Sequence, residues 1–253
     1  MMISRIEFSA YMDALLEPNR FKDYCPNGLQ VAGCEQIKTL VTGVTASQAL
    51  IDAAIGLGAD TILVHHGYFW RGEDPCIVGI KQRRLKQLLL NDINLIAYHL
   101  PLDAHATLGN NVQLARLLSL KIEGTVPNTG EPNLALFGQL ELAQTGDELA
   151  KTITRVLGRT PLFIQGHDRV NSTIAWCSGS AQSYIEQAAA LGVDVFISGE
   201  ISEQTVHLAR ELGINYIAAG HHATERYGVQ ALGEHLAEKF ALNHTFVDID
   251  NPV

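Results

Sequence analysis

The stretch TGVTASQALIDAAIGLGADTILVHHG, residues 42–67, decides the fold because it contains a complete strand–helix–strand unit. Its first strand is LVTGV (40–44), and the helix SQALIDAAIGLG (47–58) is amphipathic and closed by glycine. A second apolar strand, TILV (61–64), follows after a short turn. Two strands joined through one helix are typical of a parallel βαβ unit.

The same pattern recurs in the second half of the chain. Residues 42–67 align without gaps on WCSGSAQSYIEQAAALGVDVFISGEI (176–201). A second pair follows, in which INLIAYH (93–99) resembles INYIAAG (214–220) at a shorter offset. Because the identity is low, chance similarity between two generic βαβ units is the alternative interpretation. Four corresponding pieces in the same order favour an internal duplication.

The rest of the chain continues this alternation, which predicts an α/β fold with largely parallel sheets. The first helix is expected to start at Ser4, which forms a capping box with Glu7. Further helices are predicted at 78–92, 108–119 and 146–158, and further strands at 94–98, 134–142, 161–165 and 172–177. The stretch EGTVPNTGEPN (123–133) breaks the pattern with glycine, proline and asparagine, and is the expected domain boundary.

Composition narrows the class of protein. The 253 residues are 47% hydrophobic and 18% charged, as in ordinary globular proteins. The formal net charge of −9 argues against binding nucleic acid or acidic membranes. The exception would be a ring-shaped oligomer whose inner surface is locally basic although the net charge of the chain is negative. The four cysteines form no CxxC, and the chain has neither a signal-peptide layout nor an apolar run of ~18 residues. We therefore expect a cytoplasmic protein with reduced thiols and no membrane span.

Histidines gather where the predicted strands end. Six of the ten fall in three clusters that each follow an apolar strand: His65 and His66, His99 and His105, and His221 and His222. Asp103 lies inside the second cluster, and Glu225 closes the third at helical i,i+4 spacing from His221. Ligands in open α/β sheets bind beyond the carboxyl ends of strands, and His, Asp and Glu are ligands for zinc, iron or manganese.

Each of these residues also has a structural interpretation. A single histidine at a strand end is usually held by hydrogen bonds, His99 and His105 can belong to a turn, and His222 can orient a neighbour. Glu200 stands near the start of a predicted helix, where negative charge is favoured. Together, however, the three clusters offer more ligands than one tetrahedral ion accepts, and the two adjacent histidines of the first cluster must reach in different directions. The sequence therefore predicts a dinuclear metal centre.

No other type of site is supported by a motif. The turns GVTAS (43–47) and CSGSA (177–181) follow predicted strands, but neither is a phosphate-binding loop or a dinucleotide fingerprint. The chain also lacks a GxSxG nucleophile elbow. Nucleotide binding through a standard motif is not expected.

Seven segments resemble those of a known family, the Nif-three-like dinuclear metal-centre proteins, also called GTP cyclohydrolase I type 2 homologues. The segments are PNGLQVAG (26–33), VHHGYFWRGE (64–73), AYHLPLDAH (97–105), LGNN (108–111), ISGEISEQT (197–205), GHHATER (220–226) and FVDIDNPV (246–253). They span nearly the whole chain. The sequence is most similar to short bacterial members that lack the inserted central domain of longer relatives.

The resemblance implies two similar, intertwined α/β lobes with a metal site in the cleft between them, assembled as a toroidal homohexamer. We assign residues 1–125 plus 221–253 to the first lobe and residues 126–220 to the second. Two divalent ions per subunit are implied, with zinc, iron or manganese as the candidates. The ligands carried over by motif are His65 and His66, one to each metal, with Asp103, His221 and a bridging Glu225. His99, His222 and Glu200 would surround these ligands or face the substrate.

Two functions are compatible with such a centre. In the first, the protein is a hydrolase in which paired metals activate water for attack on C8 of the guanine of GTP, or on a phosphoester in another small molecule, nucleotide or nucleic acid. His99 or His222 would transfer protons, and Glu200 would hold an imidazole in its productive tautomer. In the second, the protein is a non-catalytic metal-binding hexamer that acts through partners as a scaffold, chaperone or sensor.

Overall fold

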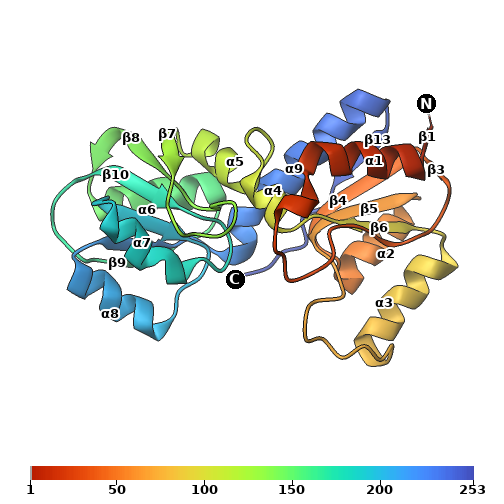
Figure 1. The fold of residues 1–253 in the computed structure, drawn as a ribbon, viewed down its shortest axis with the longest axis horizontal. Helices are drawn as coiled ribbons and strands as arrows, with labels where there is room; N and C mark the ends of the chain where they lie inside the picture. The colour runs from red at the N-terminus through yellow and green to blue at the C-terminus, as the bar shows by residue number, and fades with distance from the viewer. Residues whose placement is uncertain (1) are drawn as a thin grey trace. The chain divides into compact units, whose positions relative to one another are not determined.

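The computed structural model describes residues 2–253, which form two compact units (Figure 1). Among the described residues, the first unit comprises 2–109 and Gly228–Asp250, and the second comprises Asn110–Tyr227 and Asn251–Val253. Both units interleave helices with strands, which confirms the predicted α/β class.

The borders of these units differ from the lobes assigned from the sequence. Residues 110–125 lie in the second unit because β7 (Leu120–Thr125) pairs antiparallel with β8 (Leu136–Gln144). Residues 221–227 also belong there, although the helix that they begin, α9 (His221–Phe240), continues into the first unit. The glycine-rich stretch 123–133 therefore lies within the second unit, where it completes β7 and continues as a loop.

The first unit is built on a five-stranded sheet. Its order is β13 (Asn243–Phe246), β4 (Thr39–Thr45), β5 (Thr61–His66), β6 (Asn94–Ala97) and β2 (Gly28–Val31). The first four strands are parallel, and β2 runs antiparallel at one edge. A short ribbon of β1 (Ile3–Ser4) and β3 (Gln36–Ile37) lies apart from this sheet.

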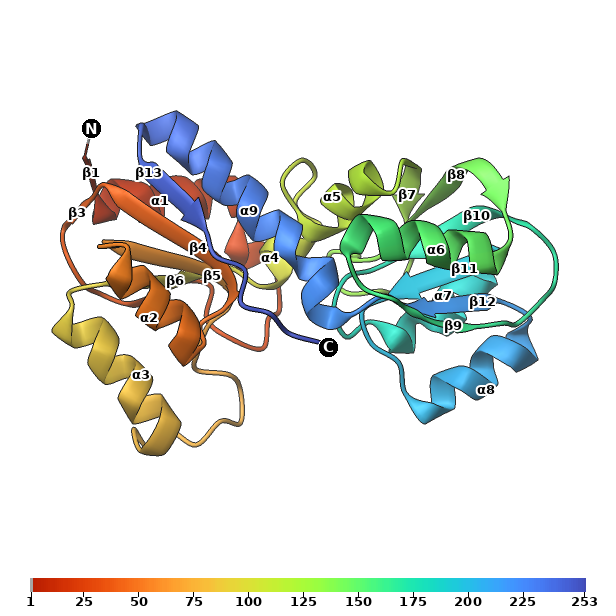
Figure 2. The ribbon, with the colours of Figure 1, turned by 180° about the vertical axis from the view of Figure 1, so that it is seen from behind.

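Helices cover both faces of this sheet because its strands are apolar on both sides (Figure 2). On one face, Ile62 and Val64 pack with α2 (Gln48–Gly56) and α3 (Gly79–Leu90). On the other, Leu63 packs with α1 (Arg5–Leu16) and the part of α9 in this unit. Successive side chains of β5 thus point to opposite cores.

The second unit has a six-stranded mixed sheet. Its order is β7, β8, β10 (Asn171–Trp176), β11 (Val195–Ser198), β12 (Asn215–Ala218) and β9 (Leu162–Ile164). Only β10, β11 and β12 are mutually parallel. The expectation of largely parallel sheets therefore holds for the first unit and not for the second. A pattern of alternating strands and helices does not reveal the direction of a strand that is connected to its neighbour by a hairpin, because such a strand runs antiparallel to that neighbour.

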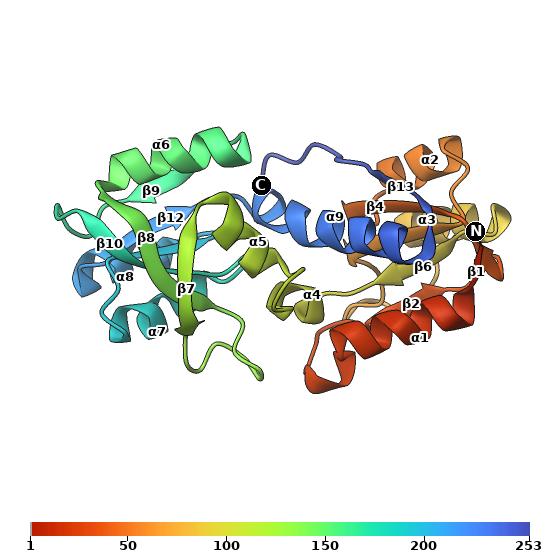
Figure 3. The same ribbon diagram turned by 90° about the horizontal axis from the view of Figure 1, so that it is seen from above.

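The helices of the second unit also lie on both faces. Leucines of α5 (Asn110–Leu117) and α6 (Gly146–Leu157) share one core with the parallel strands. In Figure 3, α6 lies on one side of the sheet and α7 (Ile185–Ala190) on the other. α8 (Glu203–Leu212) packs against α7 and β12. Shorter helical turns are η1 (Pro18–Arg20), α4 (Leu100–Ala104) and η2 (Gln182–Tyr184).

The strand orders support the internal duplication. The order β4, β5, β6, β2 in the first unit corresponds to β10, β11, β12, β9 in the second, with three parallel strands followed by an antiparallel edge. Asp60 Oδ2 accepts the backbone N–H groups of Lys38 and Thr39 at 2.8 and 2.7 Å, where β4 begins. Its counterpart, Asp194, accepts those of Ser172 and Thr173 at 2.9 Å where β10 begins.

A buried asparagine occupies matching positions in the two sheets. Asn94 Oδ1 accepts the backbone N–H of Gly33 at 2.8 Å, and Asn215 Oδ1 accepts that of Gly166 at 2.9 Å. In both units, a β-carbon on the glycine would lie 2.2 Å from a carbonyl oxygen of the segment that precedes the asparagine. The same close approach of two backbone segments therefore occurs in both units.

Two local expectations bear on the sites. Ser4 does cap α1, because its hydroxyl oxygen accepts the backbone N–H of Glu7 at 3.2 Å. Strand β5, expected to end at Val64, continues to His66, whose carbonyl accepts the N–H of Ala46 at 2.9 Å. Among residues 2–253, no helix combines the length and apolar character needed to cross a membrane.

Candidate metal centre

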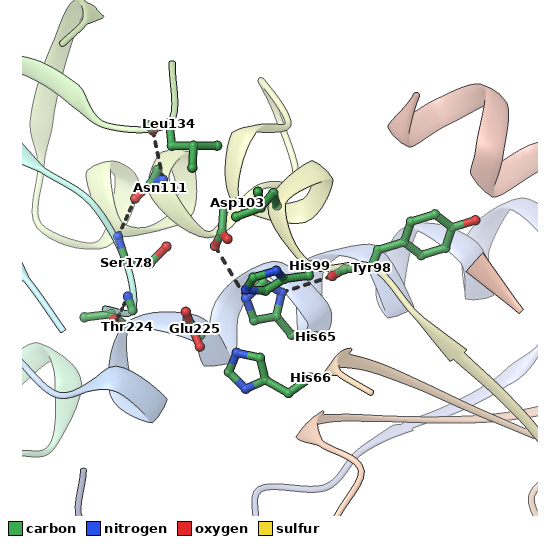
Figure 4. Close-up of polar contacts among 12 residues, drawn as sticks. His65, His66, Tyr98, His99, Asp103, Asn111, Leu134, Ser178, Thr224 and Glu225 are labelled. Carbon is green, nitrogen blue, oxygen red and sulfur yellow. Dashed lines mark hydrogen bonds and ion pairs between the residues drawn. The ribbon is translucent and has the colours of Figure 1, made fainter. Parts of the chain in front are cut away.

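Three imidazoles of the first unit gather at the carboxyl ends of β5 and β6 (Figure 4). The ring centroids of His65 and His66 are 4.6 Å apart, and that of His99 lies 5.1 Å from the first and 5.7 Å from the second. One ring nitrogen from each lies within 4.8 Å of the other two, a grouping that could hold a metal ion. The adjacent histidines therefore reach the same region, rather than diverging as strand alternation suggests.

His65 is fully buried and its ring is held in a defined orientation. Its Nδ1 lies 3.0 Å from the carbonyl oxygen of Tyr98, which can only accept, so Nδ1 donates and Nε2 carries the lone pair (Figure 4). Asp103, on α4, places its Oδ1 3.6 Å from this Nε2. A metal-bound histidine usually donates its other ring N–H to a carbonyl or carboxylate oxygen, as Nδ1 of His65 does to Tyr98. The pair of His65 and Asp103 therefore fits a metal site.

His66 is half-buried, and its Nδ1 lies 3.2 Å from the hydroxyl of Thr45 on the neighbouring strand. The residue that follows, Gly67, has no room for a side chain. A β-carbon there would lie 2.2 Å from Gln30 Oε1 and 2.6 Å from the β-carbon of Ala97. The glycine thus allows the strand end to pack closely.

His99 pairs with Asp23, an acidic residue that the sequence motifs did not identify. Its Nδ1 lies 2.6 Å from Asp23 Oδ1, and only 3% of the aspartate side chain is exposed. Burial raises the pKa of Asp23, but the hydrogen bond and charge of His99, with further donors, hold it below its usual value. Nothing in the local sequence KDYCPN (22–27) distinguishes this aspartate, which only the fold brings to His99.

In the second unit, His221 lies between two carboxylates. Its Nδ1 is 2.7 Å from Glu200 Oε1, and its Nε2 is 3.1 Å from Glu225 Oε2 one turn along α9. The i,i+4 spacing thus places both side chains on one helix face. Burial lowers the pKa of His221, but the hydrogen bonds and charges of Glu225 and then Glu200 outweigh it, raising the pKa to about 9. The site therefore strongly favours positive charge between these carboxylates.

The CSGSA turn also contributes to this site. Gly179 has φ +65°, and a β-carbon there would lie 2.2 Å from Glu225 Oε1 and 3.2 Å from His221 Nε2. Its N–H donates to the hydroxyl of Thr224 at 3.0 Å (Figure 4), and the next residue, Ser180, donates to Glu200 Oε2 at 3.0 Å. The sequence marked this turn only as following a strand and did not identify its hydrogen bond to Glu200 or its closeness to Glu225.

An asparagine from the LGNN segment holds the start of the same turn. Asn111 accepts the N–H of Ser178 at 2.8 Å and donates its amide to the carbonyl of Leu134 at 3.1 Å (Figure 4). Its side chain is buried, as is that of His222, whose backbone N–H donates to the carbonyl of Val253 at 2.9 Å. The LGNN segment thus supports the site structurally.

The other histidines have structural partners. His105 Nδ1 accepts the N–H of Leu108 at 3.1 Å in the turn after α4. His167 contacts the carbonyl of Asp194, His207 pairs with Glu203, His235 with the hydroxyl of Tyr11, and His244 with that of Thr42. These four histidines, which lie apart from the three clusters, therefore have structural partners, and so does His105.

The fold thus assembles imidazole and carboxylate groups at strand ends in each unit. Imidazole nitrogen and carboxylate oxygen are donors suited to zinc, manganese or iron, and the orienting oxygens beside them are those expected around metal-bound histidines. The clusters of histidine, aspartate and glutamate could therefore hold metal ions.

Comparison with known proteins places this chain among relatives of the same size. A GTP cyclohydrolase 1 type 2 homolog of Pseudomonas aeruginosa is 56% identical over 240 residues, covering 95% of each chain. A protein of that name from Vibrio cholerae is 54% identical over 254 residues, covering 99% of this chain and 100% of its own.

Solved structures and a family model agree with this. The structure described as protein ybgI, unknown function, superposes with a TM-score of 0.95 at 51% identity, covering 99% of this chain and all of its own. TTHA1606 from Thermus thermophilus gives 0.89 at 34% identity, with the same coverage. The model of the Duf34/NIF3 (NGG1p interacting factor 3) family matches residues 3–252. The resemblance noted in the sequence is confirmed, and the chain belongs to the Duf34/NIF3 family.

Proposed function

We propose that this protein is a metal-dependent hydrolase with two divalent ions per chain. The proposed ligands are His65, His66 and Asp103 from the first unit and His221 and Glu225 from the second. The observation that carries the proposal is the buried pair of His65 and Asp103, in which a backbone carbonyl fixes the imidazole so that its lone-pair nitrogen lies 3.6 Å from a carboxylate oxygen. Zinc, iron and manganese suit this donor set.

Bound divalent ions supply Lewis-acid activation of water at neutral pH. Around them, Glu200 orients the ring of His221 through its Nδ1, and Asp23 does the same for His99. His99 and His222 are the candidates for proton transfer to the substrate. Glu200 would hold the imidazole of His221 in its productive tautomer. Proton transfer by His99 or His222 requires a substrate bound beside their imidazole rings.

We propose a small molecule or nucleotide as substrate. The relatives' name, GTP cyclohydrolase 1 type 2 homolog, makes GTP the first compound to assay, with attack on C8 of the guanine. Phosphoesters are the second class, because the same histidine and carboxylate donors suit both reactions. The net charge of −9 disfavours nucleic acid as a partner.

We propose that the protein is cytoplasmic and that it assembles as a homohexamer. This assembly is inferred from the family resemblance and is tested separately from the metal site. Light scattering coupled to size exclusion should give a mass of six 27.6 kDa chains. A monomer at micromolar concentration would rule out the hexamer and leave the proposed ligands untouched.

Elemental analysis of the purified protein tests the metal proposal directly. The wild-type chain should carry about two ions, as a dinuclear centre requires, and His66→Ala and Glu225→Ala should each lose metal and turnover of GTP or phosphoesters. His207→Ala is the matched control, because this exposed histidine pairs only with Glu203 among the contacts found in residues 2–253. A protein without metal would contradict the proposal. A metal-replete protein inactive on every substrate would favour the non-catalytic scaffold, chaperone or sensor.

A further inference from the structure

We propose that His99 is a metal ligand in its own right and that Asp23 is the residue that positions its ring. The first unit would then present three imidazoles, not two, to the metal centre, and His222 alone would remain as the candidate for proton transfer. The inference rests on the proposed metal binding and adds to its ligand set.

The three rings share one arrangement. In each, Nδ1 faces an oxygen: the carbonyl of Tyr98 for His65 at 3.0 Å, the hydroxyl of Thr45 for His66 at 3.2 Å, and the carboxylate of Asp23 for His99 at 2.6 Å. A histidine whose Nδ1–H is donated to an oxygen carries its lone pair on Nε2, the form that binds metals. The pairing with a carboxylate is the strongest of the three and also the shortest.

Asp23 is itself held in place by further donors. Its Oδ1 also accepts the N–H of Tyr24 at 2.6 Å, and its Oδ2 accepts the amide of Asn27 at 2.9 Å and the N–H of Leu100 at 3.0 Å. Asn27 in turn accepts the backbone N–H of His99 at 2.7 Å. The loop from Asp23 to Asn27 therefore forms hydrogen bonds with both the ring and the backbone of His99, which leaves the imidazole little freedom to rotate.

His105 provides the contrast within the same segment. Its Nδ1 accepts the N–H of Leu108 at 3.1 Å and lies 3.3 Å from the N–H of Thr107, so its proton is on Nε2. That tautomer stabilises a turn and cannot offer Nε2 to a metal. Two histidines six residues apart are thus held in opposite tautomers, and only His99 is held in the metal-binding one.

A separate metal site made by Asp23, Cys25 and His99 is the competing arrangement, because their donor atoms lie within 4.8 Å of one another. Both oxygens of Asp23 already accept two hydrogen bonds each from the donors described above. Burial and the charge of Asp23 raise the pKa of the Cys25 thiol to about 12. A saturated carboxylate and a protonated thiol make this grouping a poor ligand set, so Asp23 acts on the ring of His99.

Titration of the metal-free full-length protein with Co²⁺ tests the assignment, because the visible spectrum of Co²⁺ reports its ligands. Replacing a residue that orients a metal-bound histidine typically lowers metal affinity about 10- to 100-fold. We expect Asp23→Asn to fall in that range for one of the two ions, because neither orientation of the amide satisfies all four donors. His99→Gln should lose at least as much affinity and change the Co²⁺ spectrum.

Two matched variants separate ligation from general loss of structure. His105→Gln removes a nearby histidine of the opposite tautomer, and Asp60→Asn removes a carboxylate that also accepts backbone N–H groups of this unit. Both should keep wild-type affinity and spectrum, with circular dichroism confirming that every variant is folded.

Wild-type affinity and spectrum in folded His99→Gln would overturn the ligand assignment. Unchanged affinity in Asp23→Asn alone would overturn the positioning role. A wild-type protein that binds no Co²⁺ at all would instead refute the proposed metal binding.

Discussion

The turn at Gly179 offers a sharp test of how the second unit holds its acidic site. Gly179→Ala places a methyl group in a left-handed backbone at φ +65°, 2.2 Å from Glu225 Oε1 and 3.2 Å from His221 Nε2. The Glu225 side chain is only 3% exposed, so we expect its carboxylate to move away from the methyl group and to lose the 3.1 Å contact that its other oxygen, Oε2, makes with His221. Gly213 has the same φ of +65°, and among the described residues no atom beyond its own local backbone and chain neighbours lies within 4 Å of its would-be β-carbon.

The two glycines therefore separate backbone strain from the contact. The left-handed conformation costs a side-chain-bearing residue about 1–2 kcal/mol, a term common to both substitutions. Loss of a hydrogen bond between charged groups adds about 1.5–3 kcal/mol at Gly179 alone. We expect Gly179→Ala to lower the free energy of unfolding by about 2.5–5 kcal/mol, and Gly213→Ala by about 1–2 kcal/mol.

Urea unfolding of the metal-free protein measures both effects at equal protein concentration. Circular dichroism reports the whole chain, and tryptophan fluorescence reports both units, through buried Trp176 at the end of β10 in the second and Trp70 in the first. Gly179→Ala should also weaken metal binding, because Glu225 is displaced, whereas Gly213→Ala should not. Equal destabilisation by the two substitutions, within about 0.5 kcal/mol, would refute the argument, since the site would then accommodate the methyl group without loss.

Two further predictions concern the contacts repeated in both sheets. Burial raises the pKa of Asp194, but hydrogen bonds from Thr173 and Ser172 hold it below its usual value. A depressed folded pKa stabilises the protein above the unfolded pKa, and the gain disappears as the pH falls through the folded value. Asp194→Asn should therefore cost about 1–2 kcal/mol at pH 7, and urea midpoints should converge with wild type below about pH 4; a gap independent of pH would contradict this. Asn215→Ala leaves the N–H of Gly166 and the amide oxygen of Asn171 buried without this partner, at about 2–4 kcal/mol. Hydrogen exchange should then quicken in β9 and β12, and unchanged protection there would show that the asparagine contributes little.

Much of the fold follows from local rules that a sequence expresses directly. Apolar runs predicted the parallel strands other than β13, the Ser4 cap predicted where α1 begins, and the four-residue spacing of His221 and Glu225 predicted a shared helix face. The repeat of 42–67 at 176–201 predicted two related units, because a βαβ unit has the same periodicity wherever it occurs. These features depend on neighbours a few residues away.

Strand direction and domain membership were beyond such rules. Strands β7, β8 and β9 pair antiparallel, and β7 lies in the second unit. Direction is set by which edge of the sheet is open to a returning chain, and that information is spread over the whole domain.

The partners of the candidate ligands depended most on tertiary structure. Asp23 meets His99 across 76 residues and Glu200 meets His221 across 21, since the order of the strands brings their loops together. Gly179 lies against Glu225 because the loop after β10 passes the first turn of α9. The sequence by itself determined which residues have the chemistry to bind metal. Only the folded sheets decided which oxygen orients each imidazole, because hydrogen bonds depend on positions to within a few tenths of an ångström.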